Sequence, residues 1–202
     1  MTKSGIASLP MYDWPELRGA TDAFWDAIRM KLDANGIPAA RCLSRGASDD
    51  AYWTAPDLLL GQTCGYPLAT SLKGKVRYVA TPVYSVEGCE GPKYSSAIVV
   101  NNDSMQELPT LAGSTFAYNS KTSLSGYRAM RAMFGEPEAF FTKTIKSGGH
   151  RNSAKMVADG SAEVAAIDAV CWDMLQKFEI ETAQKLRVIG WTAKQPSLPS
   201  SR

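Results

Sequence analysis

Short apolar stretches alternate with stretches of helical periodicity along most of this chain, and that alternation constrains its fold more than any other feature. In the first part, residues 6–11 and 57–61 are short and apolar, and a weaker strand is expected at residues 41–43. Residues 14–34 carry apolar side chains at helical spacing until an Asn-Gly pair ends the pattern. Short strands separated by helices are typical of parallel sheets. The pattern therefore predicts the α/β class.

The same alternation restarts in the second part of the chain. Two β-rich stretches, residues 76–83 and 94–100, flank the turn-rich loop 87–92, and we place the change of lobe there. Beyond it, we expect strands at residues 115–118, 144–147, 163–167 and 186–191, and helices at residues 124–134, 152–159 and 170–178.

These patterns predict a two-lobed α/β protein. We expect a first lobe over residues 1–86, a second lobe over residues 87–191, and a tail over residues 192–202 that returns toward the first lobe. Ligands of open α/β sheets bind beyond the carboxyl ends of the strands, so we expect a cleft there. Strands near Val83 and Tyr94 would form the hinge on which the lobes close.

Charge and apolar content exclude several classes of function. The 22 Lys and Arg residues against 20 Asp and Glu leave a net charge of +2 without any basic block, so no nucleic-acid partner is expected. The longest apolar runs fall well short of the ~20 residues of a membrane helix, so the chain is expected not to span a membrane. The first residues also lack the apolar stretch of a secretion signal.

Cysteine spacing argues against a metal site. The four cysteines, Cys42, Cys64, Cys89 and Cys171, lie too far apart in sequence for a metal-binding pair, and the chain has a single histidine. We therefore expect no metal and no cofactor. One or two disulfides in an oxidising compartment and buried free thiols both stay open as interpretations.

The junction after the expected strand at residues 115–118 has the composition of an anion-binding turn. Asn119 and three further polar residues lead to Ser123, Ser125 and Gly126, where a helix is expected to begin. The first turn of a helix has main-chain N–H groups without partners and the positive end of the helix dipole, so hydroxyls there can complete a shell around an oxyanion. His150, which follows two glycines, is a candidate for one more ligand contact.

Several segments together resemble a known family. They are residues 8–13 (SLPMYD), 61–67 (GQTCGYP), 91–96 (GPKYSS), 123–127 (SLSGY), 148–150 (GGH) and 165–168 (AAID). In this order and spacing they resemble the phosphate-, phosphite- and phosphonate-binding proteins of ABC importers, which have the periplasmic binding protein type II fold. The resemblance covers about residues 6–199.

The resemblance implies a receptor that closes on a small anion, either phosphate, phosphite or a phosphonate, and delivers it unchanged to an ABC permease. It implies that Ser123 and Ser125 hold oxygens of the anion and that His150 donates a further hydrogen bond. It also implies that Asp168 accepts from an amino or hydroxyl group of the ligand. The full expected ligand-binding set is Tyr12, Gln62, Thr63, Tyr94, Ser95, Asn119, Ser123, Ser125, Gly126, His150 and Asp168.

The chain also departs from that family. Members usually continue past the strand equivalent to residues 186–191 and pack terminal helices on the first lobe, so we expect a fold that is short at its C-terminus. The resemblance implies a periplasmic location, whereas the absence of a visible signal sequence leaves a cytoplasmic relative as the alternative.

Each expected contact has a purely structural alternative. Ser123 and Asp168 are residue types that cap helices with or without a ligand, and His150 could cap the helix expected from Asn152. Gln62 and Thr63 would face the cleft if the first lobe is parallel, and otherwise would make local hydrogen bonds. The tyrosines could pack between elements.

Three other functions stay open. Cys64 or Cys89 with His150 and Asp168 would supply the residue types of a thiol nucleophile, base and orienting group, although we expect no enzyme. A receptor or enzyme of the same fold could bind a thiamine-precursor pyrimidine by aromatic stacking, and a protein that binds another small molecule is a related alternative. A module that had lost its ligand could instead bind a protein partner through apolar surface of the first lobe.

Overall fold

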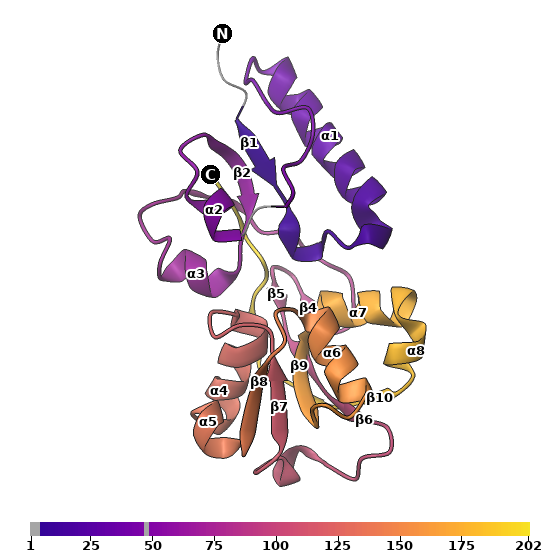
Figure 1. Ribbon diagram of the computed structural model, residues 1–202. Helices are drawn as coiled ribbons and strands as arrows, with labels where there is room; N and C mark the ends of the chain where they lie inside the picture. The colour runs from indigo at the N-terminus through magenta and orange to yellow at the C-terminus, as the bar shows by residue number, and fades with distance from the viewer. Residues whose placement is uncertain (1–4, 47–48) are drawn as a thin grey trace. The chain divides into compact units, whose positions relative to one another are not determined.

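The computed structural model describes residues 5–46 and 49–202 (Figure 1). Residues 1–4, the expected start of the first lobe, lie outside the described residues. The chain divides into two compact units, Met1–Pro82 with Leu198–Arg202 (unit 1) and Val83–Ser197 (unit 2). Residues 83–86 and 192–197 therefore lie in unit 2, whereas the sequence assigned them to the first lobe and to the tail. Both units combine strands and helices, which confirms the α/β class.

Unit 1 is built on a sheet with the strand order β1-β2-β12-β3. Strands β1 (Ile6–Ser8) and β2 (Leu58–Gln62) are parallel, as the βα pattern predicts. The tail supplies β12 (Ser200–Ser201), which runs antiparallel to β2 and to β3 (Tyr78–Ala80). The last residues of the chain thus complete the sheet in which the chain began.

Three predictions for unit 1 are wrong in detail. The strand expected at residues 6–11 ends at Ser8, and a 3-10 turn follows it. Residues 41–43 form no strand, because the chain bends there and the amide of Ser44 donates to the carbonyl of Ala7. The β-rich stretch 76–83 is a strand only over Tyr78–Ala80. β-branched and aromatic composition indicates where a strand can form, but the available pairing partner, the short β12, sets its length.

The helices of unit 1 are α1 (Arg18–Ala34), α2 (Asp49–Trp53) and α3 (Gly65–Ala69), with 3-10 turns at Pro10–Tyr12 and Pro15–Leu17. Trp25 is the buried residue of α1, and its indole N–H donates to the carbonyl of Ala40 at 3.1 Å. It packs with Ala7, Leu9 and Leu43 in the core of this unit.

Unit 2 is built on a five-stranded sheet with the order β10-β6-β9-β7-β8. Its strands are β6 (Ser96–Asn101), β7 (Thr115–Tyr118), β8 (Lys143–Lys146), β9 (Val164–Asp168) and β10 (Leu186–Trp191). Strand β7 runs parallel to β8 and β9, and β6 runs antiparallel to β9 and β10. These strands confirm the sequence prediction to within one or two residues. A small second sheet joins β11 (Gln195–Pro196), β5 (Lys93–Tyr94) and β4 (Cys89–Glu90).

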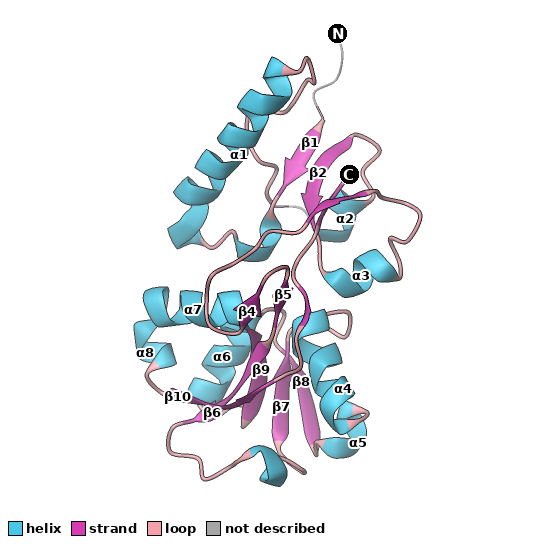
Figure 2. Ribbon diagram, turned by 180° about the vertical axis from the view of Figure 1, so that it is seen from behind, coloured by secondary structure: helices cyan, strands magenta, loops and turns pink. Residues whose placement is uncertain are grey.

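Helices cover both faces of the five-stranded sheet (Figure 2). They are α4 (Ala129–Phe134), α5 (Pro137–Phe140), α6 (His150–Ala158), α7 (Ala169–Phe178) and α8 (Ile180–Ala183), with a 3-10 turn at Leu108–Thr110. Met130 of α4 packs on the face formed by Ile98, Phe116 and Val164. Helix α6 contacts β6, β7 and β9. Successive side chains of a strand point to opposite faces of the sheet, so each strand can supply both packing surfaces.

The expected helix at residues 124–134 consists of two consecutive helical segments of different type. Leu124–Arg128 is a π-helical turn, and α4 continues from it. The amide of Arg128 bonds to the carbonyl of Ser123 at 3.0 Å, an i to i+5 pairing. A π turn inserts one extra residue into a helix, and such turns are rare and frequent at functional sites.

Candidate anion-binding site

The loops that follow β7, β8 and β9 meet at one edge of the sheet of unit 2. These strands are parallel, so their carboxyl ends lie at the same edge. Strand β7 leads to Asn119, β8 leads to His150 at the start of α6, and β9 ends at Asp168. The topology therefore brings together residues that the sequence separates by up to fifty positions.

The loop after β7 contributes residues 123–126 to this edge of the sheet, and we call them the 123–126 turn. Ser123 is the N-cap of the π turn, and its Oγ accepts from the amide of Gly126 at 3.1 Å. Asn119 folds back over this turn, since a Cβ at Gly126 would lie 2.1 Å from Asn119 Oδ1 and 3.2 Å from Ser123 Oγ. Only glycine leaves room for so close an approach. The structure confirms the capping role that the sequence suggested for Ser123.

His150 is the centre of the site. It is only 9% exposed, and its Nε2 lies 2.7 Å from Ser125 Oγ, 3.2 Å from Asn119 Nδ2 and 3.2 Å from Asp168 Oδ2. Ser123 Oγ lies 3.4 Å from Ser125 Oγ. The Ser125 hydroxyl, the Asn119 amide and the Asp168 carboxylate thus all lie around Nε2 of the His150 imidazole.

Asp168 joins this cluster from the end of β9. It is the N-cap of α7, where its Oδ1 accepts from the amide of Cys171 at 2.9 Å. Its other oxygen, Oδ2, faces His150, and the side chain is buried. The sequence offered helix capping and a place in the site as alternatives for Asp168. Its carboxylate caps α7 with one oxygen and lies beside His150 with the other.

Burial lowers the pKa of His150 below its usual value, while the Asp168 carboxylate and the carbonyl of Ala166 act in the opposite direction. The ring is therefore neutral at neutral pH. Nε2 of the ring lies 3.2 Å from a donor, the Asn119 amide nitrogen, and 3.2 Å from an acceptor, Oδ2 of Asp168. A bound anion would favour the forms of the ring in which Nε2 carries a proton and donates.

The main chain of the turn is anchored to the sheet. Ser96 of β6 is fully buried, and its hydroxyl donates to the carbonyl of Ser125 at 2.8 Å. The amide of Ser96 in turn donates to Thr192 Oγ1 at 2.9 Å. Sequence reasoning missed Ser96, although it adjoins the expected residue Ser95 and its position in a buried apolar strand is a signal that could have found it.

Two further expected residues of unit 2 lie beside the cluster. Ser95 donates its amide to the carbonyl of Gly88 at 2.7 Å and accepts from the amide of Ala169 at 3.0 Å. Tyr94, on β5, is buried in unit 2. Their expected ligand contacts stay predictions.

The remaining expected residues lie in unit 1. Tyr12 ends the 3-10 turn Pro10–Tyr12 and is half-buried. Gln62 ends β2, and its Oε1 accepts from the amide of Met11 at 3.3 Å, which holds that turn. Thr63 is fully buried, and its amide donates to the carbonyl of Pro199 at 2.9 Å. These local hydrogen bonds match the structural alternative for Gln62 and Thr63, and a ligand role for them stays a prediction.

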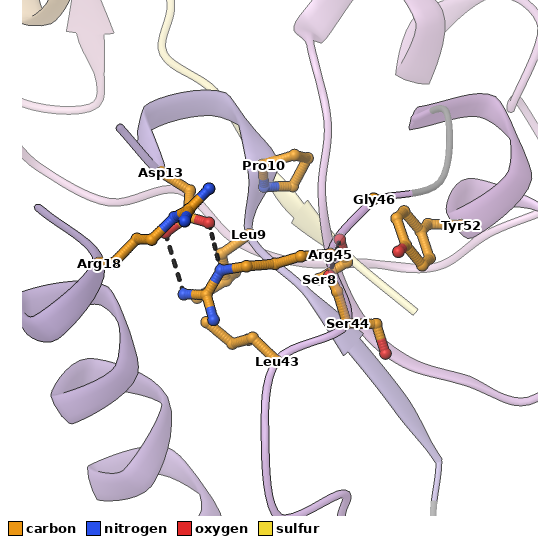
Figure 3. A pocket seen from close by; sticks show the side chains of 10 residues that line it. All are labelled: Ser8, Leu9, Pro10, Asp13, Arg18, Leu43, Ser44, Arg45, Gly46 and Tyr52. Carbon is orange, nitrogen blue, oxygen red and sulfur yellow. Dashed lines mark hydrogen bonds and ion pairs between the residues drawn. The ribbon is translucent and has the colours of Figure 1, made fainter. Parts of the chain in front are cut away.

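Unit 1 also contains a cavity that sequence reasoning missed (Figure 3). Its volume is about 160 Å³, and its polar lining includes Arg18, Arg45, Asp13 and Tyr52. Arg45 donates to Asp13 at 3.0 Å and to Asp22 at 2.8 Å, and these carboxylates raise the pKa of the guanidinium. The pairs join residues far apart in sequence, so no spacing pattern could have indicated the cavity.

Within residues 5–46 and 49–202, no group of three acidic, histidine or cysteine residues has an arrangement that could hold a metal ion. No helix in the same part of the chain has the length and apolar character needed to cross a bilayer. All four cysteines are free thiols, with Cys64 and Cys171 buried and Cys42 exposed.

Solved structures share this fold. A binding protein component of an ABC phosphonate transporter from Pseudomonas aeruginosa aligns at a TM-score of 0.69 and 15% identity, covering 98% of this chain and 68% of that one. PhnD1 from Prochlorococcus marinus, in complex with methylphosphonate, aligns at 0.73 and 19%, covering 98% and 75%. A protein from Xanthomonas citri bound to ATP aligns at 0.63 and 17%, covering 87% and 69%. The expected two-lobed type II fold is confirmed.

The solved structures are too distant in sequence to assign the chain to a family, whereas a family model does assign it. No curated protein matches the chain. The family described as "ABC transporter, phosphonate, periplasmic substrate-binding protein" matches residues 56–201, which is more than half of the chain and includes the whole His150 cluster. This confirms the family resemblance drawn from the sequence motifs. The chain belongs to the periplasmic substrate-binding proteins of phosphonate ABC transporters.

Proposed function

We propose that this protein binds a phosphonate or a related oxyanion at the 123–126 turn and His150, and delivers it to the permease of an ABC importer. The observation that carries the proposal is the 2.7 Å contact between Ser125 Oγ and His150 Nε2 at the start of a helix. A bound anion would replace this contact by accepting from both groups and from main-chain amides of the turn. The methylphosphonate seen in the Prochlorococcus neighbour supports the ligand class.

The buried Asp168 carboxylate narrows the ligand class. None of Asn119, Ser123, Ser125 and His150 is a Lys or Arg, and the Asp168 carboxylate lies 3.2 Å from His150 Nε2. A fully ionised anion would face that carboxylate with no proton to share. We propose that the preferred ligand carries a donor, either a protonated oxygen or an amino group as in an aminoalkylphosphonate.

We further propose that the protein works in the periplasm, as its family does, and that it performs no chemistry on its ligand. The thiols support the second point. Burial, with the Asp168 and Asp173 carboxylates, raises the pKa of Cys89, which disfavours the thiolate that a nucleophile needs. Closure of the two lobes on the ligand stays a prediction.

Calorimetric titration tests the proposal. The ligands are methylphosphonate, 2-aminoethylphosphonate, phosphite, phosphate, sulfate and ATP, with ATP included because the Xanthomonas neighbour contains it. Ser125→Ala should weaken binding of the preferred anion by about 1–3 kcal/mol, or roughly 5- to 150-fold. Ser120→Ala is the matched control, because its hydroxyl lies in the same loop and contacts Thr122 at 3.1 Å. Equal affinities of the Ser125→Ala variant and the wild type would contradict the site.

A further inference from the structure

Glu138, on the short helix α5, contacts the residues on either side of the 123–126 turn. Its Oε2 accepts from the hydroxyl of Tyr127 at 2.6 Å, and its Oε1 pairs with Lys121 Nζ at 2.7 Å. Lys121 precedes the turn by two residues, and Tyr127 follows it directly. One carboxylate therefore holds both ends of the segment that carries Ser123, Ser125 and Gly126.

The Tyr127 ring strengthens this connection. The ring is buried and packs edge-on against Tyr118, the last residue of β7, with centroids 5.2 Å apart. Lys121 Nζ lies over the same ring, 5.7 Å from its centroid. The Tyr127 ring, in the π turn, thus contacts both the end of β7 at Tyr118 and the loop at Lys121.

The charges of this cluster are stable over the whole usual pH range. Lys121 and Tyr127 lower the pKa of Glu138 to about 2. Burial and the Glu138 carboxylate raise the pKa of Tyr127 to about 12. Between these values Glu138 is an acceptor and Tyr127 a donor, so the hydrogen bond does not depend on pH.

We infer that Glu138 is a positioning residue for anion binding, which holds the π turn in the register that places Ser125 beside His150. This inference rests on the proposed function. A π turn carries one more residue than an α turn, and relaxation to the α form would rotate the side chains at its start, Ser125 among them, by up to about 100° relative to α4. Such a rotation would separate Ser125 Oγ from His150 Nε2. The Glu138 bonds to Lys121 and Tyr127 oppose it.

Three variants separate the parts of this arrangement. Glu138→Ala removes both contacts, Glu138→Gln keeps an acceptor for Tyr127 but loses the ion pair, and Tyr127→Phe removes only the hydroxyl. Glu136→Gln is the matched control, because it makes the same charge change two positions away, where the carboxylate accepts from Arg131 Nε at 2.7 Å instead.

The readouts are the affinity for methylphosphonate and the imidazole NMR signals of the ligand-free protein, which has a single histidine. We expect Glu138→Ala to raise the dissociation constant by at least about tenfold and to shift the His150 signals. Glu138→Gln should recover part of both effects, and Tyr127→Phe should produce an intermediate change. Glu136→Gln should leave the affinity within about twofold of wild type.

The outcomes distinguish this inference from the proposed function. If the wild type binds methylphosphonate and Glu138→Ala binds it equally well with unshifted His150 signals, the inference is wrong. If neither wild type nor Glu136→Gln binds any anion of the calorimetric set, the proposed function fails, and the His150 signals of the ligand-free variants still decide whether Glu138 positions the turn. If Glu138→Ala does not fold, Glu138→Gln and Tyr127→Phe decide in its place.

Discussion

His150 Nε2 lies 2.7 Å from Ser125 Oγ, although the two residues are 25 positions apart in the chain. The contact exists because β7 and β8 are parallel neighbours, so the loops that follow them meet at one edge of the sheet. Each group satisfies the other in this contact. An arriving anion therefore exchanges one set of hydrogen bonds for another and does not find exposed donors, which makes its affinity depend on geometry.

The buried imidazole predicts how stability depends on pH. Burial lowers the pKa of His150 in the folded protein below its usual value of 6.5. As pH falls through 6.5 the unfolded chain therefore gains a proton that the folded chain does not, so the free energy of unfolding decreases until the pH reaches the folded pKa. Urea unfolding of the ligand-free protein at a series of pH values should show this slope. His150→Gln, which removes the only histidine, should lose it, and an unchanged slope would contradict the burial argument.

Gly126 is predicted to tolerate no side chain. In Gly126→Ala the new methyl group would meet Asn119 Oδ1 at 2.1 Å, so either Asn119 or the turn must move. We expect a loss of stability of about 1–3 kcal/mol and at least a tenfold (about 1.4 kcal/mol) loss of anion affinity. Gly19→Ala is the control, because a Cβ there meets nothing within 4 Å. Urea unfolding and calorimetry measure the two effects, and normal binding by Gly126→Ala would argue against this packing.

Asp168 is predicted to select ligands that bring a donor. Asp168→Asn keeps an oxygen that can cap the amide of Cys171 and removes the charge beside His150. Relative to wild type, we expect affinity for sulfate to rise by at least about tenfold and affinity for 2-aminoethylphosphonate to fall. Asp173→Asn, on α7 with Lys177 as partner, should change neither. Competition calorimetry gives the ratio, and an unaltered preference in Asp168→Asn would refute the selection.

The thiols are predicted to be dispensable for binding. Burial and the Asp168 carboxylate raise the pKa of Cys171 well above its ordinary value, whereas Cys42 is exposed. Treatment with iodoacetamide at neutral pH should modify Cys42 first and leave Cys171 unmodified in the folded protein. Mass spectrometry identifies the modified residues, and calorimetry should give an unchanged anion affinity. A loss of binding that follows modification of Cys89 would revive a thiol-dependent function.

Local patterns predicted most of the fold of unit 2. The strand at residues 115–118 and the capping residues Ser123 and Asp168 could be read from the sequence because apolar runs and cap preferences are local. The π turn could not, since a single inserted residue leaves the apolar spacing of residues 124–134 almost unchanged. The absent strand at residues 41–43 shows the same limit, because strand formation depends on a partner that the sequence does not name.

The sequence predicted those site residues that lie at an expected helix start or in a family segment. Ser125, His150 and Asp168 belong to that set, and the structure brings them together. Ser96 and Glu138 act through contacts with residues elsewhere in the chain, and only Ser96 falls in one of the family segments, residues 91–96. Arg45 likewise meets Asp13 across 32 positions in unit 1, and only Asp13 falls in a family segment, residues 8–13.

The most direct test of the account follows the imidazole of His150 by NMR while methylphosphonate is added to the wild-type protein. His150 is the only histidine, so its signals are unambiguous. The account predicts a saturable shift toward the protonated form, with the same dissociation constant that calorimetry gives, and a weaker or absent response in Ser125→Ala. Calorimetric binding of methylphosphonate with no change at His150 would contradict it.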